Sequence, residues 1–236
     1  MKKPPFRTLR LMLHRLMGSK TATLADVRLT TDTDRIPRSL ATAIFKGTYE
    51  LAERRLVTRA LRPGDRVLEI GTGLGFVSLL CARIAGPENV LSYEANPALE
   101  SIIRANHALN DMAPALRMKA VTRDGAPVTF HQNANVVSSS LLERGLEATK
   151  IEVPSDAFDA ALTEHRPDVI VMDIEGGELD VLSETALTGV RALVIELHPH
   201  IVGEEATNAL LASLAERGFS ETAREHKNVL LTRAAT

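Results

Sequence analysis

The stretch Arg66-Val67-Leu68-Glu69-Ile70-Gly71-Thr72-Gly73-Leu74-Gly75 joins an apolar segment to a turn rich in glycine. Residues 66–70 predict a buried strand, and residues 75–85 predict a helix with one apolar face. Glycines at alternating positions allow positive φ angles and leave no Cβ between the backbone and a ligand. The helix that follows directs free N–H groups at the loop. The stretch therefore predicts the first βα unit of an α/β fold, with a ligand site in its loop.

The spacing of the loop and of two acidic residues indicates which ligand binds. A dinucleotide fingerprint would need glycine at position 76, where this chain has Phe76. Glu69 ends the first strand, and Glu94 ends the next one, 23 residues after Gly71, where a carboxylate can accept two ribose hydroxyls. S-adenosylmethionine carries that ribose without phosphates, and its cationic sulfonium and ammonium groups favour a nearby carboxylate such as Glu69. We therefore expect S-adenosylmethionine; an NAD-type oxidoreductase and a non-catalytic binding module are the alternatives.

Strand-like and helix-like patterns alternate after the loop, which predicts a parallel, doubly wound sheet. The expected fold is α/β, a Rossmann-like, seven-stranded, mostly parallel sheet closed by an antiparallel C-terminal hairpin. We predict strands at 66–70, 90–94, 115–121, 168–173, 191–197, 219–223 and 228–232, and helices at 75–85, 97–109, 156–164, 177–188 and 204–217. Short β-like runs at 128–131 and 150–153 belong to an insertion over 124–153, expected beside the cofactor.

Four stretches of this chain, in the same order, make it similar to the FkbM family of S-adenosylmethionine-dependent methyltransferases. They are Gly47-Thr48-Tyr49-Glu50, Pro63-Gly64-Asp65, Asp173-Ile174-Glu175-Gly176-Gly177-Glu178 and Val194-Ile195-Glu196-Leu197-His198. The run Ser138-Ser139-Ser140-Leu141 lies where the family has an Asn-then-Ser-Ser-Leu segment. The family commonly has Gly-Ala-Asn in the loop, where this chain has Gly71-Thr72-Gly73.

The resemblance implies an O-methyltransferase that acts on a hydroxyl of a sugar, a glycan or a small metabolite. The expected cofactor-binding residues are Tyr49, Glu69, Gly71, Thr72, Gly73, Gly75, Glu94, Ala95 and Asp173. From the residues alone, Tyr49 is as compatible with an ordinary helix surface, and the serine run with a surface loop. The resemblance favours a place in the site for both.

Several ionisable groups are expected at the carboxyl edge of the sheet. Asp173 follows an apolar strand, and open α/β sheets bind ligands at that edge. Glu175 follows in a turn loosened by two glycines, and His198 follows the neighbouring strand. Methyl transfer to a hydroxyl requires alignment of donor and acceptor and removal of a proton. We expect Asp173, Glu175 and His198 to be catalytic, with His198 as the base because an unperturbed imidazole has a pKa near about 6.5.

Metal binding is an alternative for the same residues. Glu196, His198 and His200, together with Asp173, would supply suitable ligand types, but spacing alone does not fix their geometry, and we expect no metal. Glu178 is expected to be a carboxylate in the first turn of a helix.

Length and composition set further limits. The 236 residues have a net charge of −2, which gives no reason to expect a nucleic-acid partner. The single cysteine, Cys81, is expected in the core, compatible with a reducing cytoplasm, and no apolar run is long enough to span a membrane. Residues 1–25 carry +6 against −8 for the remainder, and their amphipathic stripe predicts packing on the domain or on a second subunit, with a membrane surface as the alternative. We expect an N-terminal helical arm and cap at 1–61 and one methyltransferase domain at 62–236.

Overall fold

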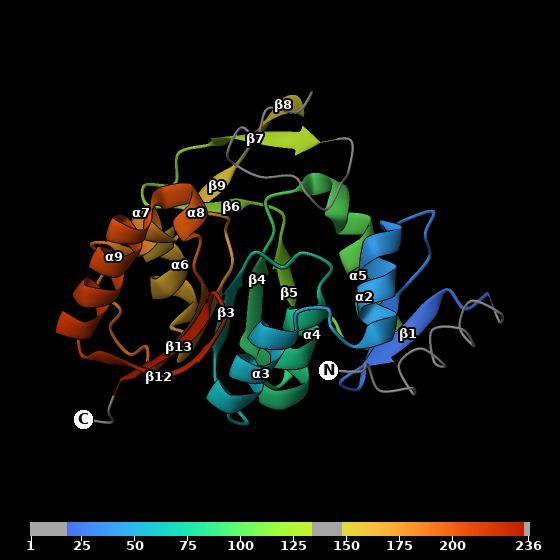
Figure 1. Ribbon diagram of the computed structural model, residues 1–236, viewed down its shortest axis with the longest axis horizontal. Coiled ribbons are helices and arrows are strands. Elements are labelled where there is room, and N and C mark those ends of the chain that lie inside the picture. Colours follow the sequence, from blue (N-terminus) through green and yellow to red (C-terminus); the bar gives the residue numbers. More distant parts are fainter. Residues whose placement is uncertain (1–17, 134–147, 234–236) are drawn as a thin grey trace.

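The computed structural model describes residues 18–133 and 148–233. Its centre is a seven-stranded sheet in the order β12-β13-β11-β10-β3-β4-β5 (Figure 1). The strands are β3 (Val67–Ile70), β4 (Val90–Tyr93), β5 (Ala115–Arg117), β10 (Val169–Met172), β11 (Ala192–Glu196), β12 (Phe219–Glu225) and β13 (Asn228–Arg233). β13 runs antiparallel to both of its neighbours, and the other pairs are parallel. The expected mostly parallel sheet with an antiparallel C-terminal hairpin is confirmed.

Helices cover both faces of the sheet, which explains why its central strands are apolar on both sides. One face carries α3 (Leu51–Ala60), α4 (Phe76–Ala85) and α5 (Glu100–Leu109), and the other carries α6 (Phe158–His165), α7 (Glu178–Leu182) and α9 (Glu204–Glu216) (Figure 1). The buried side chains form one large cluster on each face. Cys81 is fully buried in the first cluster, as expected.

The strand order places a topological switch point, here called the crevice, beside β3. The chain runs from β3 outward to β4 and β5, and then crosses back to β10 on the other side of β3. The loops that leave β3 and β10 therefore diverge at neighbouring positions of the sheet edge. In open α/β sheets this switch point is where ligands bind. The glycine loop and Asp173 stand on either side of it.

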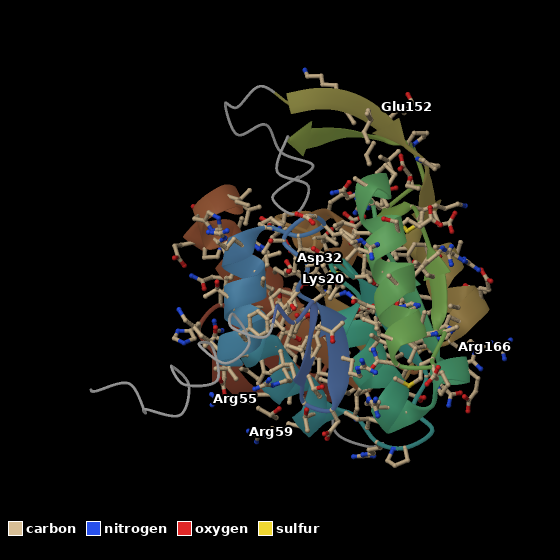
Figure 2. The ribbon with its side chains drawn as sticks, turned by 90° about the vertical axis from the view of Figure 1, so that its right-hand side faces the viewer. Lys20, Asp32, Arg55, Arg59, Glu152 and Arg166 are labelled. Carbon is tan, nitrogen blue, oxygen red and sulfur yellow. The ribbon has the colours of Figure 1, made fainter. Side chains whose placement is uncertain are left out.

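The N-terminal part differs from the expected helical arm. Residues 21–30 form a β-hairpin of β1 (Thr21–Leu24) and β2 (Val27–Thr30), whose inward side chains belong to the core. The hairpin is held to α5 because the backbone N–H of Thr30 donates to the Asn106 side chain at 2.8 Å. Lys20 pairs with Asp32 across the ends of the hairpin at 2.8 Å (Figure 2). Residues 1–17, which hold most of the expected arm, lie outside the described residues.

Two helices lie within the segment predicted as helical arm and cap, one on each side of Gly47. α2 (Arg38–Lys46) ends at this glycine, which has a φ of 70°, and α3 begins four residues later. α3 packs on α4, β11 and β13, so it is part of the helix layer and does not lie over the site. The expected cap is thereby reduced to the short connection between the two helices.

Other differences lie after β4. The strand expected over 115–121 is two strands, because β6 (Ala120–Thr122) leaves the main sheet and pairs with β9 (Ser155–Ala157). The helix expected over 177–188 ends at Leu182, and the Thr185 hydroxyl donates to the Val181 carbonyl that a continuing helix would use. Within the insertion, β7 (Val128–Asn133) and β8 (Ala148–Val153) form a hairpin at the top of Figure 1.

Three short helices complete the elements: η1 (Pro87–Asn89), η2 (Pro97–Leu99) and α8 (Pro199–Val202). The serine run Ser138–Ser140 lies outside the described residues. Among the helices that are described, none has the length and apolar character needed to cross a membrane.

Candidate active site

The glycine loop is pinned to the end of β4. The backbone N–H groups of Gly71 and Thr72 both donate to the carbonyl of Tyr93, at 2.9 and 3.2 Å. The chain then turns into α4, whose first residue follows Gly75. The loop therefore has a fixed position relative to Glu94, the residue directly after Tyr93.

The three glycines of the loop serve different purposes. A Cβ on Gly71 would lie 1.8 Å from the carbonyl oxygen of Asp173, so this glycine permits close contact between the ends of β3 and β10. A Cβ on Gly75 would meet Ile103 of α5 at 3.1 Å. Gly73 is different, because the nearest atom to its Cβ position is the Tyr49 hydroxyl at 3.7 Å. Gly73 is therefore the glycine of this loop that leaves room for a ligand.

Glu94 is buried beside this room and is held by the backbone. Its two oxygens accept from the N–H groups of Gly73 and Asn96, both at 2.8 Å. Burial raises the pKa of Glu94 to about 7, although these hydrogen bonds lower it. A fixed carboxylate at the end of the second strand is the acceptor expected for two ribose hydroxyls. Ala95 follows it, half-buried against a small cluster of Ala120 and Val153.

Glu69 lies behind the loop. It is buried, and its carboxylate accepts from the Thr72 hydroxyl at 2.6 Å. Burial raises the pKa of Glu69 to about 7. The structure thus gives Glu69 and Thr72 a part in shaping the loop, whereas the sequence suggested direct attraction of the cofactor's cationic groups by Glu69.

Tyr49 covers the loop from the N-terminal side. Its ring is buried and packs at 5.8 Å, centroid to centroid, on the ring of Phe76, the first residue of α4. Glu50, which follows, has a left-handed backbone with φ 44°. This turn brings the connection between α2 and α3 to the glycine loop, so the structure places Tyr49 at the site.

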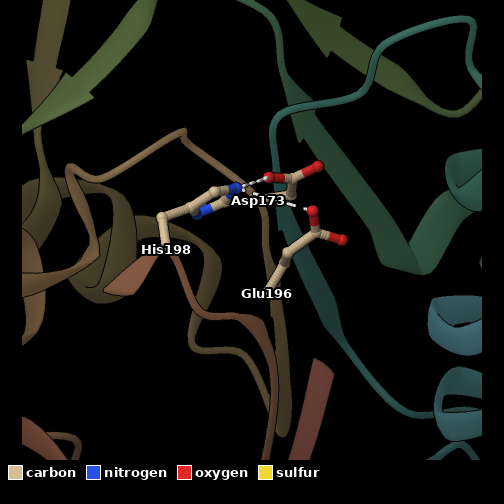
Figure 3. Close-up of side chains that lie close together, drawn as sticks. All are labelled: Asp173, Glu196 and His198. Carbon is tan, nitrogen blue, oxygen red and sulfur yellow. Dashed lines mark ion pairs between the residues drawn. The ribbon is translucent and has the colours of Figure 1, made fainter. Parts of the chain in front are cut away.

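His198 lies at the centre of an acidic cluster on the other side of the crevice. Its Nε2 atom is 3.6 Å from Asp173, 3.8 Å from Glu175 and 3.5 Å from Glu196, and its Nδ1 atom is 3.0 Å from Glu178. Figure 3 shows the ring edge directed between Asp173 and Glu196. The four carboxyl groups come from the ends of β10 and β11 and from the first residue of α7.

The C-terminal hairpin completes the cluster. Lys227, in the turn between β12 and β13, forms an ion pair with Glu196. Asn228 of β13 donates from its side-chain amide to the same carboxylate at 3.0 Å. Glu196 is therefore oriented from a strand that lies far from the glycine loop in the sequence.

The pKa values of the cluster reflect its crowding. Burial, followed by the negative charges of Glu196 and Glu50, raises the pKa of Asp173 well above its ordinary value. Burial would raise the pKa of Glu196, but its contacts with His198 and Lys227 lower it to about 2. Burial would lower the pKa of His198, but Glu178 and Glu196 raise it to about 10.

Two observations argue against the expected role of His198 as the base. Its pKa is not that of an unperturbed imidazole. Its side chain is also 0% exposed, whereas the side chains of Asp173 and Glu175 are 27% and 42% exposed. Asp173 and Glu175 are therefore open to solvent, whereas His198 lies behind the surface.

Sequence reasoning recognised Glu178 and Glu196 but missed their roles. Glu178 does lie in the first turn of α7, and its carboxylate also accepts from the Ile174 N–H at 3.1 Å while it contacts His198. Asp173, Glu196 and His198 can each offer one ligand atom within 4.8 Å of the others, which is a spacing suited to a metal ion. Lys227 was missed altogether, because no local pattern links a hairpin turn to a distant strand end.

Comparison with solved structures finds distant similarities. The ribosomal protein L11 methylase of Lactobacillus delbrueckii subsp. bulgaricus is 16% identical, with 80% of each chain covered and a TM-score of 0.46. The precorrin-6y C5,15-methyltransferase of Geobacter metallireducens is 13% identical, with 78% of this chain and 88% of that chain covered and a TM-score of 0.46. An O-methyltransferase of Bacillus cereus, in complex with SAH, is 14% identical, with coverages of 99% and 93% and a TM-score of 0.44.

Comparison of the sequence itself is more informative. No curated protein matches the chain. A family model, described as the methyltransferase FkbM domain, matches residues 69–221, from the end of β3 into β12. The match spans the glycine loop, Glu94, His198 and the four carboxyl groups around His198. The family uses S-adenosylmethionine, which is therefore the cofactor of this chain. The chain belongs to the FkbM family and is an S-adenosylmethionine-dependent methyltransferase.

Proposed function

We propose that this methyltransferase transfers the methyl group to a hydroxyl of a sugar, a glycan or a small metabolite. The observation that carries the proposal is the contact between the two halves of the crevice. The carbonyl of Asp173 lies against Gly71 of the cofactor loop, while the Asp173 carboxylate belongs to the acidic cluster around His198. Proton-accepting groups therefore adjoin the place where the cofactor binds.

The residues present fit the cofactor. Gly73 leaves room beside Tyr49, and the fixed carboxylate of Glu94 would accept the ribose hydroxyls. Ala95, Gly71, Gly75, Thr72 and Glu69 would shape the surrounding wall. When bound, S-adenosylmethionine supplies a methyl group on a positively charged sulfur.

The residues of the chain then have two tasks, which are to orient the acceptor and to take its proton. A hydroxyl is a weak nucleophile until its proton leaves, and a carboxylate is an acceptor for that proton. Glu175 or Asp173, the exposed members of the cluster, would accept the proton that the acceptor hydroxyl releases on methylation. His198 and Glu178 hold these carboxylates in place and act as positioning residues.

The proposal is tested with S-adenosylmethionine labelled at its methyl group and a panel of hydroxylated sugars, glycans and small metabolites. The expected product is a methyl ether, identified by the carbon shift of its O-methyl group. Glu205→Gln, an exposed change on α9, serves as the control and should leave turnover unchanged. Methyl transfer to nitrogen or carbon acceptors, with none to hydroxyls, would contradict the proposal.

A further inference from the structure

The Nε2 atom of His198 is a buried polar atom without a hydrogen-bond partner. The side chain is 0% exposed, and the distances from Nε2 to Asp173 and Glu196, 3.6 and 3.5 Å, are longer than hydrogen bonds. The Oδ1 atom of Asp173 is also buried and without a partner. Buried polar atoms normally have partners, so a bound ligand is expected between Nε2 and Oδ1.

Glu178 fixes the orientation of the imidazole. Nδ1 lies 3.0 Å from the Glu178 carboxylate, which also accepts from the Ile174 N–H. Because a carboxylate accepts, Nδ1 is the donor, and Nε2 is directed toward Asp173 and Glu196 (Figure 3). Histidines that bind metals are commonly held in this way, with one ring nitrogen donating to a carboxylate and the other facing the ion.

The spacing of the free atoms fits a metal ion. Ligand atoms at about 2.0–2.2 Å from an ion in a tetrahedral arrangement lie about 3.4 Å from one another. The two distances from Nε2 are close to this value, and all three ligand atoms lie within 4.8 Å of one another. Small side-chain movements would bring them to a common centre.

The local charge also favours a cation. Four carboxyl groups lie within 3.8 Å of a ring nitrogen of His198, so oxygen atoms that can bind a cation are concentrated around the imidazole. Lys227 pairs with Glu196, but its side chain is 49% exposed, so it can turn into solvent at little cost when another cation takes its place.

We propose that Asp173, Glu196 and His198 bind one divalent transition-metal ion such as Mn²⁺ or Zn²⁺. Two carboxylates and one imidazole suit these ions, and three protein ligands leave coordination positions open. Glu175 lies 3.8 Å from Nε2, beside the three ligands. The proposal extends the proposed function, since an acceptor hydroxyl bound to the ion would lose its proton more readily. The binding itself depends on neither the cofactor nor the acceptor.

The test is a titration of the full chain, after chelator treatment, with MnCl2 and separately with ZnCl2. Calorimetry follows both ions, and electron paramagnetic resonance follows free Mn²⁺. One saturable site per chain is expected. Asp173→Asn and Glu196→Gln should each weaken binding at least tenfold, whereas Glu205→Gln should not change it. Thermal unfolding without metal checks that the variants fold.

Lys227→Gln separates a metal site from an ion-pair cluster. If Lys227 competes with the ion for Glu196, this change should tighten metal binding several-fold. Absence of saturable binding by the unaltered chain, or equal affinities in all variants, would overturn the proposal. Because no acceptor is present in these titrations, a wrong assignment of the acceptor class would leave their outcome unchanged.

Discussion

The carbonyl oxygen of Asp173 lies where a side chain on Gly71 would begin, 1.8 Å from its Cβ position. The backbone N–H of Asp173 also donates to the carbonyl of Ile70 at 2.9 Å. The cofactor loop and the acidic cluster are thus joined through main-chain atoms of adjacent strands. A change on either side must alter the other.

Gly71→Ala should strongly destabilise the protein, because the new methyl group cannot coexist with the Asp173 carbonyl. Gly64→Ala is the matched control, since Gly64 also has a positive φ, +82° against +94°, but no atom within 4 Å of its Cβ position. The left-handed conformation alone costs about 1–2 kcal/mol. In urea unfolding, the free energy of unfolding should fall by about that amount for Gly64→Ala and by more for Gly71→Ala. Equal decreases would mean that the backbone at Asp173 moves away from the new methyl group without cost.

Glu94→Ala should weaken binding of S-adenosylmethionine roughly ten- to hundredfold. Hydrogen bonds to a charged group contribute about 1.5–3 kcal/mol, and ribose hydroxyls would lose their acceptor. Calorimetric titration measures the change, with exposed Glu88→Gln as the control. An unchanged affinity in Glu94→Ala would remove Glu94 from the cofactor site.

Cofactor affinity should rise as the pH increases from about 6 to about 8. Burial raises the pKa of Glu94 to about 7, and the ionised form is the better acceptor for two hydroxyls. The ionised fraction changes about tenfold over this range, which sets the largest expected effect. Glu94→Gln should flatten the profile. Because Glu69 also has a pKa of about 7, the Glu69→Gln variant measures how much Glu69 contributes to the pH dependence of cofactor affinity. A flat profile in the unaltered protein would contradict the prediction.

The cofactor-free protein should become less stable as the pH rises from about 4.5 to about 7. Burial raises the pKa values of both Glu69 and Glu94 to about 7, so the folded chain holds more protons than the unfolded chain in this window. Across this pH window, the contribution of each group to the free energy of unfolding falls by on the order of 3 kcal/mol. Urea unfolding at several pH values should show a shallower decline in Glu94→Gln than in the unaltered protein.

Glu175→Gln should lower kcat by about a hundredfold or more while cofactor affinity stays the same. General-base catalysis contributes about 10²–10⁴-fold, and Glu175 is the most exposed carboxylate beside His198. Steady-state kinetics and calorimetry separate the two effects. If Asp173→Asn loses activity and Glu175→Gln does not, Asp173 accepts the proton. Full activity in both variants would show that the proton goes elsewhere.

The sequence predicted the structure correctly wherever a local pattern of residues determines it. Apolar runs gave the central strands, and the residues directly after them, Gly71, Glu94 and Asp173, lie at the sheet edge because strand ends must emerge there. The N-terminal hairpin escaped notice because its strands are four residues each and have too few residues for a clear alternation.

The electrostatics of the site could not be predicted from local patterns. The basicity of His198 depends on carboxylates from β10, β11 and α7, which only the fold brings together. The role of Glu69 depends on how deeply its side chain is buried, because a residue at the end of a strand can face either the ligand or the core. Both properties belong to tertiary neighbours rather than to spacing along the chain.

The ion pair from Lys227 to Glu196 and the hydrogen bond from Asn228 give the site an order of assembly. The β12–β13 hairpin follows every other described element in the chain. A nascent chain on the ribosome that has not yet exposed residues 219–233 already contains the glycine loop, Glu94 and His198, but it lacks Lys227 and Asn228, which orient Glu196. The contacts of the acidic cluster are therefore complete only when the hairpin pairs with β11.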